Sequence, residues 1–481
     1  MHSSLTIILL LQLSRRIVIM SQRKKIFIAI FLPLAFFTFV LLSGFVHRNN
    51  AERANLASDF KRASEAYAQA AKIFFWQKDL WEKAGIAAAQ AGNYAEAILY
   101  FQNVNTLSEQ GWAWLGASYF QTGNTEKAIT TFEEGLQKYR SAALYRLLAS
   151  AQRAQKNWQA EKTALENQIA LDSQDAYAHY RLGILLMIFS PDEAFGVLNR
   201  ASSLNGEVDS AAQTLITALN IADTQTNEAE QYVTIGRALG LVQEWDLAYT
   251  AFEKALTFNN QHAEAWAWLG EAKQQLGYDG SAELDKALWL NHTSATVRGL
   301  RALYWSRQEK YAQMLAEYSL ANEFEPTNPA WLTGIGEAHA KLGDLISALN
   351  AYQQAVGLAP QDATYWRLLA MFCAEHNIYI EEIGLPAAEQ AVNLSPNDAA
   401  NLDALGYLYF LSGRYSNAEL TLLQALELSP QYFPAHLHLA MTYLSQNNRP
   451  AAYNALTFVR DADASGAYRA LAIQFLNQYF P

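Results

Sequence analysis

Few side chains in this sequence have the type and the spacing that chemistry requires. The chain of 481 residues has a single cysteine, Cys373, which excludes an intrachain disulfide and a zinc site built from several cysteines. Cys373 and His376 lie three residues apart, close enough to touch on one helix face, but a metal site needs about four ligands and no further ligand is evident. We therefore expect Cys373 to be a buried structural thiol.

Other reactive patterns are also missing from the sequence. His436 and His438 are two residues apart and do not share a helix face. There is no glycine-rich phosphate loop, no GxSxG nucleophile elbow and no HExxH metal motif. The sequence therefore predicts no catalytic residue, no metal site and no cofactor, and a protein that is not an enzyme.

The distribution of charge excludes nucleic acid as a partner. Lys and Arg number 35 against 46 Asp and Glu, a net charge of −11. Residues 1–48 hold six basic side chains and no acidic one, so the remainder has 29 basic and 46 acidic residues and a net charge of −17. A nucleic-acid surface needs clustered Lys and Arg, which this acidic body lacks.

Residues 26–46 predict a transmembrane helix. This run of 21 residues carries no charge and would span about 30 Å as a helix, the thickness of the hydrocarbon layer. The alternative is a cleaved signal peptide, whose apolar region is only about 7–15 residues long and precedes a small-x-small cleavage site. Because the run is longer and Ser43-Gly44-Phe45 is a poor site, we expect an uncleaved anchor in contact with the lipid bilayer.

The flanking charges predict the orientation of this anchor. Arg23, Lys24 and Lys25 adjoin its N-terminal end, inside a basic segment of residues 1–25, whereas the other end has Arg48 and Arg53. By the positive-inside rule, residues 1–25 stay in the cytoplasm and everything after the anchor lies outside it. We expect a single-pass protein of the cell membrane, in a bacterial cell. Whether translation starts at Met1 or Met20 stays open.

The rest of the chain is dominated by an internal repeat. One stretch, GWAWLGASYFQTGNTEKAITTFEEGL, begins at Gly111, and another, NLDALGYLYFLSGRYSNAELTLLQALELSP, begins at Asn401. Each has a large residue, an apolar-small pair, a glycine that ends a helix, and then small and large residues at spacings of four and three. One unit carries, in order, Leu402, Leu405, Gly406, Tyr409, Ala418, Leu422, Ala425 and Pro430.

This pattern resembles the tetratricopeptide repeat (TPR), a helix-turn-helix unit. Positions 8, 20 and 27 of a unit are small and position 24 is large, so two helices approach closely while large side chains fill the remaining space. A single hairpin cannot bury its apolar face, but stacked hairpins can. The resemblance implies an all-α fold, a TPR-type α-solenoid preceded by one transmembrane helix. Trp112, Trp266 and Trp366 are expected in its core.

The repeat covers almost all of the chain after the anchor. We predict a solenoid over residues 51–464, with an initial half-unit and eleven further units. Residues 208–222 lack the motif, the unit at residue 142 has Glu161 where a small residue is expected, and an insertion falls around Ile380–Pro386. Residues 465–481 are expected to form a C-terminal capping helix.

The resemblance also implies where partners bind, since members of this family usually hold peptides on the concave surface of the solenoid. By register, positions 2, 5, 6, 9, 12 and 13 of the first helices face it. In the N-terminal part these positions hold Trp114, Phe120, Arg146, Arg153, Tyr177, Tyr180 and Arg181, a composition typical of binding hot spots. In the C-terminal part they hold Tyr407, Phe410, Leu411, Leu437, Met441 and Leu444, a groove suited to an amphipathic helix.

Two interpretations of these residues stay open at the level of sequence. They bind a partner, or they pack against neighbouring units, against the tail helix or lie in solvent. We expect a membrane-anchored scaffold or adaptor that binds protein partners in an envelope assembly process. The alternative is an accessory subunit of an envelope enzyme complex, in glycan or cytochrome assembly, and a less favoured one is an enzyme in its own right.

Overall fold

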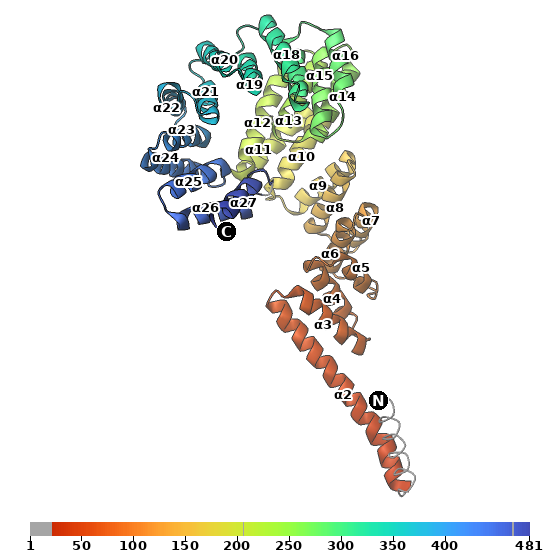
Figure 1. Cartoon of the computed structure of the whole chain (residues 1–481). Coiled ribbons are helices and arrows are strands. Elements are labelled where there is room, and N and C mark those ends of the chain that lie inside the picture. Colours follow the sequence, from red (N-terminus) through yellow and green to blue (C-terminus); the bar gives the residue numbers. More distant parts are fainter. Residues whose placement is uncertain (1–21, 205, 464–465) are drawn as a thin grey trace. The chain divides into compact units, whose positions relative to one another are not determined.

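The computed structural model describes residues 22–204, 206–463 and 466–481, which are almost entirely helical and contain no β-strand (Figure 1). The predicted all-α fold is therefore confirmed. The basic segment predicted for residues 1–25 lies outside the described residues except for its last four.

The helices form two compact blocks. The N-terminal block extends to Asn220 and the C-terminal block begins at Ile221, within one helix. The N-terminal block contains α2 (Gln22–Leu56), α3 (Phe60–Ile73), α4 (Asp79–Gln90), α5 (Tyr94–Phe101), α6 (Glu109–Gln121), α7 (Thr125–Leu136), α8 (Ala142–Ala154), α9 (Trp158–Leu171), α10 (Ala176–Phe189), α11 (Pro191–Leu204) and most of α12 (Gly206–Asp223). The C-terminal block contains α13 (Glu228–Leu241), α14 (Trp245–Phe258), α15 (Ala263–Gln275), α16 (Ser281–Leu290), α17 (Ala295–Arg307), α18 (Tyr311–Phe324), α19 (Pro329–Lys341), α20 (Leu345–Leu358), α21 (Ala363–His376), α22 (Leu385–Leu394), α23 (Ala399–Leu411), α24 (Tyr415–Leu428), α25 (Phe433–Ser445), α26 (Arg449–Ala462) and α27 (Ala467–Tyr479).

The two helices of a hairpin pack closely where a small residue of the first helix faces a large residue of the second. In the hairpin of α6 and α7, a methyl group placed on Gly116 would lie 2.2 Å from the ring of Phe132, which is fully buried. In the hairpin of α13 and α14, the same distance from Gly236 to the Phe252 ring would be 2.4 Å. Any side chain at these glycines would push the two helices apart, which explains the predicted pairing of repeat positions 8 and 24.

A recurring hydrogen bond stabilises the turn between one hairpin and the next. At the fourth residue of several first helices, a polar-tipped side chain donates a hydrogen bond to the main-chain carbonyl six residues earlier. The Nε1 atoms of Trp266 and Trp366 reach the carbonyl oxygens of Asn260 and Pro360, both at 2.9 Å. The corresponding pairs elsewhere are His179 with Ser173 at 3.2 Å, Arg298 with His292 at 3.0 Å and His436 with Pro430 at 2.9 Å.

The expectation that three tryptophans lie in the core is wrong. Trp112, Trp266 and Trp366 are half-buried, not buried. An indole N–H at the edge of the hairpin finds a carbonyl acceptor in the turn for Trp266 and Trp366, which it would lack in the apolar interior. Trp112 differs, because its Nε1 is buried without a hydrogen-bond partner among the described residues.

The irregular parts of the repeat have simple structural solutions. Residues 208–222, which lack the motif, lie within the single helix α12. The insertion near Ile380 forms a π-helical turn (Ile380–Gly384) that leads directly into α22. The tail helix α27 packs on α26, where Ala472 and Leu476 join a buried cluster with Leu456.

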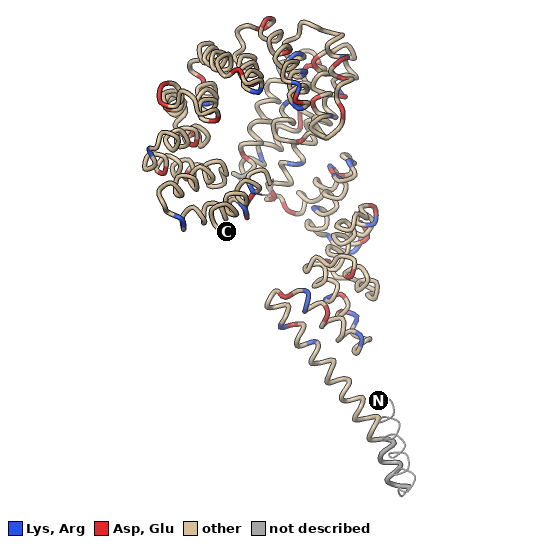
Figure 2. The backbone as a smooth tube through the Cα atoms, viewed as in Figure 1, with Lys and Arg blue, Asp and Glu red and all other residues tan. Residues whose placement is uncertain are grey.

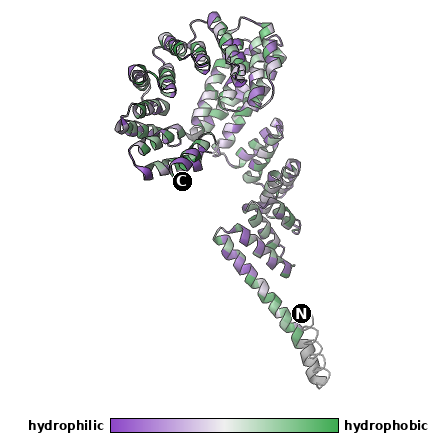
Figure 3. Cartoon of the chain, viewed as in Figure 1, coloured by the Kyte–Doolittle hydropathy of each residue, from purple (hydrophilic) through white to green (hydrophobic). Residues whose placement is uncertain are grey.

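The long helix α2 differs from the expected anchor in its length. It is continuous over 35 residues and does not end at Val46. Its last turns pack against α3, where Ala51 and Ala54 share a buried cluster with Tyr67, so α2 supplies the first helix of the predicted half-unit. Within the described residues, α2 is the helix long and apolar enough to cross a membrane (Figure 3).

Candidate functional site

In several places the first helices of successive hairpins contact each other directly. In the N-terminal block α4 contacts α6 and α6 contacts α8, and in the C-terminal block α21 contacts α23 and α23 contacts α25. Within the C-terminal block, Figure 1 shows α19, α21 and α23 on the inner side of an arc and α20, α22 and α24 on its outer side. We call the surface of the first helices the inner face.

On the inner face of the N-terminal block, cationic and aromatic side chains meet across two hairpins. The guanidinium of Arg153 on α8 donates a hydrogen bond of 3.1 Å to the Tyr177 hydroxyl on α10. Tyr177 is 54% exposed, and Arg146, about two turns before Arg153 on α8, is also exposed. The Arg153–Tyr177 hydrogen bond therefore links α8 to α10, and Arg146 and Tyr177 are exposed while Arg153 is half-buried.

The other predicted residues of this block are less accessible. Trp114 and Phe120 on α6 are half-buried, as is Tyr180 on α10. In these three side chains, part of the ring packs within the solenoid and part remains at its surface. They are consistent with either interpretation left open by the sequence.

Arg181 is a correction to the predicted site. Its side chain is 2% exposed, and its guanidinium forms two hydrogen bonds with the Glu161 carboxylate, Nε–Oε1 at 2.6 Å and Nη2–Oε2 at 3.1 Å. Its guanidinium also lies 5.9 Å from the centre of the Trp158 ring. A charge so deeply buried needs a partner, so Arg181 is committed to Glu161 and cannot serve a ligand.

The same pair explains the irregular residue of the unit at 142. Glu161 occupies a position where other units have a small side chain, and it is 1% exposed. Its carboxylate is accommodated because α10 of the next hairpin brings Arg181 to it. A departure from the repeat pattern in one hairpin is thus compensated by an arginine of the next hairpin.

The inner face of the C-terminal block carries a ladder of rings. Tyr407 on α23 stacks on His438 of α25, with ring centres 4.0 Å apart and an angle of 8° between the planes. Tyr407 also stacks on Phe410 at 6.1 Å. Phe410 in turn lies 6.0 Å from Tyr415. Met441, one turn after His438 on α25, is half-buried.

His438 is the residue that the sequence interpretation missed. Its Nδ1 lies 2.7 Å from Oδ1 of Asp403, whose side chain is buried, so the imidazole is held between a carboxylate and the Tyr407 ring. In the sequence, His438 stands out only by its spacing of two residues from His436. Its register, the sixth residue of its first helix, was the signal that placed it on the inner face.

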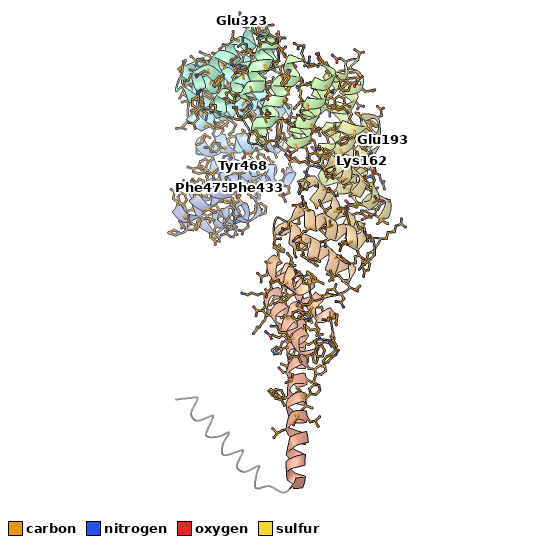
Figure 4. The ribbon with its side chains drawn as sticks, turned by 90° about the vertical axis from the view of Figure 1, so that its right-hand side faces the viewer. Lys162, Glu193, Glu323, Phe433, Tyr468 and Phe475 are labelled. Atoms are coloured by element: carbon orange, nitrogen blue, oxygen red, sulfur yellow. The ribbon has the colours of Figure 1, made fainter. Side chains whose placement is uncertain are left out.

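The tail helix covers part of the inner face at its C-terminal end. Leu437, predicted to line the groove, is buried in the cluster that contains Ala472 and Leu476 of α27. Phe433, Tyr468 and Phe475 gather at the same end (Figure 4), with the Phe433 and Tyr468 ring centres 6.2 Å apart. The apolar surface at Leu437 is therefore occupied by the chain itself, while Tyr407 and Phe410 lie one hairpin earlier.

Cys373 is buried as expected. Burial raises the pKa of its thiol to about 11, which disfavours the reactive thiolate. The neighbouring imidazole of His376 packs against the Phe372 ring at 4.9 Å. In the part of the chain that the structure describes, no three His, Cys, Asp or Glu side chains are grouped as metal ligands.

Comparison with known proteins identifies the repeats. Models of the tetratricopeptide repeat match residues 109–137, 333–383 and 399–432. These segments correspond to α6 with α7, to most of α19–α21 and to α23 with α24. The chain therefore carries tetratricopeptide repeats, as the spacing of small and large residues predicted.

Individual similar proteins are more distant. Superkiller protein 3 of Schizosaccharomyces pombe is 22% identical over 343 residues, which cover 68% of this chain and 21% of that protein. The chain thus spans about a fifth of the length of that curated relative. The crystal structure of yeast Tom70 aligns with 90% of this chain and 95% of that chain at 13% identity and a TM-score of 0.44. MamA of Desulfovibrio magneticus RS-1, from residue 41 to its end, aligns with 36% of this chain and 97% of that chain at 21% identity and a TM-score of 0.31.

Proposed function

We propose that this protein is a membrane-anchored scaffold, because a solenoid of tetratricopeptide repeats presents an inner face that can bind segments of protein partners. The repeat fold supports a role in protein–protein interaction. The observation that carries the proposal is the surface formed by Arg146, Arg153 and Tyr177. These side chains lie on the first helices α8 and α10, which the Arg153–Tyr177 hydrogen bond links, and Arg146 and Tyr177 are exposed. Arg181 of the same face is buried in its ion pair with Glu161.

The two blocks offer different chemistry to a partner. On α8 and α10 the guanidinium groups are suited to carboxylates and the Tyr177 ring adds apolar contact area. On α23 and α25 the ladder of Tyr407, His438 and Phe410 is mostly aromatic and fits an apolar helix face. Figure 2 shows acidic and basic residues interspersed along the helices, so local groups of charge on the inner face help to select partners.

We further propose that residues 26–46 of α2 span the membrane with the N-terminus in the cytoplasm and the solenoid outside, where it serves an envelope assembly process. The uncharged run and the basic residues that precede it support this arrangement. A tethered solenoid holds its partners near the membrane, and this raises their effective concentration, so modest affinity suffices.

Site-specific photo-cross-linking in native membranes tests the binding face. A photoreactive residue is placed at Tyr177 or Phe410, and the matched control is Leu420, which is exposed on the second helix α24. We expect a defined cross-linked product from the inner positions and none from Leu420. The product at Tyr177 should weaken when Arg146→Ala and Arg153→Ala are combined. Equal products from all three positions would contradict the proposal.

Topology is tested separately with a reporter joined after residue 481. A reporter that functions only outside the cytoplasm should be active, and one that functions only inside should not. The opposite pattern would reverse the proposed orientation and leave the binding face untouched, because the two claims depend on different residues.

A further inference from the structure

The structure points to a second contact with the membrane, and this inference rests on the proposed anchor. We propose that the turn between α3 and α4 enters the lipid interface beside α2. We call residues Ile73–Trp76 the aromatic turn, since they read Ile-Phe-Phe-Trp. The proposed occupant of its exposed surface is the headgroup region of the bilayer.

Packing fixes the aromatic turn at the level of the last turns of the apolar run. The buried ring of Phe74 meets the ring of Phe45 edge to face, with centres 5.1 Å apart. A methyl group on Gly44 would lie 2.6 Å from the Phe74 ring, so the missing side chain allows this close approach. Leu41 packs against the same buried cluster as Phe74.

These contacts place the aromatic turn at the end of the segment proposed to span the membrane. Leu41, Gly44 and Phe45 all belong to the uncharged residues 26–46. If that run crosses the hydrocarbon layer, its last turns lie at the outer boundary, and α3 returns along α2 to the same depth. The α2–α3 turn lies at the other end of the hairpin, with Leu56 about 15 Å beyond Val46 along the helix.

The side chains of the turn have the composition of a membrane interface. Phe75 is 67% exposed and Trp76 is 53% exposed, although the two rings contact each other with centres 5.0 Å apart. Lys72 and Lys78 flank the turn and are exposed. Tryptophan at the boundary and lysine at the phosphates are the arrangement that anchors a protein at the lipid surface. Neighbouring exposed aromatic rings at this depth therefore indicate lipid as their environment.

Depth-dependent fluorescence quenching tests this inference in the full-length protein. Single cysteines are introduced by Phe39→Cys, Trp76→Cys and Leu56→Cys and labelled with an environment-sensitive fluorophore. The native Cys373 is buried, and labelled wild-type protein gives its background. The proteins are reconstituted in phosphatidylcholine–phosphatidylglycerol vesicles that contain lipids with a nitroxide either near the headgroup or near the end of the acyl chain.

The three positions separate the inference from the anchor on which it rests. We expect position 39 to be quenched by the deep nitroxide, and position 76 to lose most of its emission to the shallow one with a blue-shifted spectrum. Position 56, which is 87% exposed at the opposite end of the same hairpin, should keep its emission. An unquenched position 39 would overturn the anchor and this inference together. Quenching at 39 with position 76 behaving like 56 would overturn this inference alone.

A second label guards against a local folding defect. Phe75→Cys should give the same depth as Trp76→Cys, because both side chains lie on the exposed surface of the turn. Thermal unfolding followed by circular dichroism should match the wild type for each variant. If folded Phe75→Cys and Trp76→Cys both report solvent, the aromatic turn does not contact lipid.

Discussion

Arg181 shows why the inner face cannot be identified from register alone. Its position in the repeat is equivalent to that of His438, yet the Arg181 side chain is 2% exposed and that of His438 is 17% exposed and stacks on Tyr407. Both meet a buried carboxylate of the preceding hairpin, Glu161 on the second helix α9 for Arg181 and Asp403 on the first helix α23 for His438. A guanidinium that is paired with a carboxylate in the interior stabilises the fold and is not available to a partner, whatever its position in the repeat.

We predict that Arg181→Met lowers the free energy of unfolding by about 3–5 kcal/mol, because Glu161 is left buried without a partner. The double variant Glu161→Leu with Arg181→Met should recover part of this loss, since it removes both charges. Urea unfolding followed by circular dichroism measures these changes. The exposed Arg146→Ala is the control and should change stability by less than about 0.5 kcal/mol. A loss in Arg181→Met no larger than the control would refute the role given to the pair.

At the scale of the elements, a hydrogen bond from the fourth residue of the first helix joins five of the described hairpins to the turn before them. Trp, His and Arg share this position because each carries an N–H at the end of a partly apolar side chain. The repeat signature asks only for a large residue there. Only the structure shows that the N–H group at this position donates a hydrogen bond to a carbonyl of the preceding turn.

We predict that Trp366→Phe costs more stability than Trp112→Phe by about 1–2 kcal/mol. The first change removes the hydrogen bond to the Pro360 carbonyl, whereas the second removes a buried N–H that has no partner among the described residues. Both lose a similar ring area, so each variant is a control for the other. Urea midpoints compare them, and equal losses would mean that the hydrogen bond contributes nothing net.

The turns inside the hairpins depend on one residue in the left-handed conformation. Gly92, Gly123, Gly343 and Gly413 occupy this position and have φ of 80°, 79°, 83° and 76°. Other hairpins place ordinary residues there, with φ of 64° at Gln243 and 55° at Glu309. The main-chain geometry is retained, since Gln243 N–H donates to the Gly240 carbonyl in the same way that Gly343 N–H donates to that of Ala340.

We predict that Gln243→Gly stabilises the protein by about 0.5–1 kcal/mol and that Gly343→Ala destabilises it by about 1–2 kcal/mol. No atom lies within 4 Å of a methyl group on Gly343, so the expected cost is purely conformational. Gly357→Ala on α20 is the matched control, because it has the same free space and a helical conformation and should stabilise slightly. Thermal unfolding distinguishes the three. An unchanged stability of Gly343→Ala would contradict the claim that the left-handed conformation of Gly343 disfavours other residues there.

At the scale of the whole molecule, α2 couples the proposed anchor to the first hairpin without a linker. Residues 47–56 continue the helix, and their buried alanines belong to the core cluster of α3 and α4. In a solenoid each hairpin is stabilised mainly by its neighbours. A defect at α2 should therefore affect α3 and α4 and fade along the N-terminal block.

We predict that a chain beginning at residue 50 is soluble and mainly helical, but that its α3 amides exchange faster with solvent than those of a chain beginning at residue 38. The shorter chain lacks Leu41 and Gly44, which pack against the end of α3, whereas the longer one keeps them. Exchange in α6–α9 should be alike in both, as expected for nearest-neighbour stability. Hydrogen exchange with mass spectrometry tests this, and equal protection of α3 would show that α2 does not stabilise it.

The sequence by itself determined the helical repeat, the turn glycines and the apolar run of residues 26–46. All three follow from local periodicity, because side chains a few residues apart on a helix must share one face. Register also predicted inner-face positions for Arg153 and Tyr177, which the structure joins by a hydrogen bond between α8 and α10.

Only the tertiary structure decided which side chains are free for a partner and where α2 ends. Glu161 and Arg181 are 20 residues apart in sequence and Gly44 and Phe74 are 30 apart, so no local pattern brings them together. Burial, ion pairing and close approach arise between helices, and they depend on the shape of both surfaces. The same long-range packing holds the aromatic turn beside the apolar end of α2.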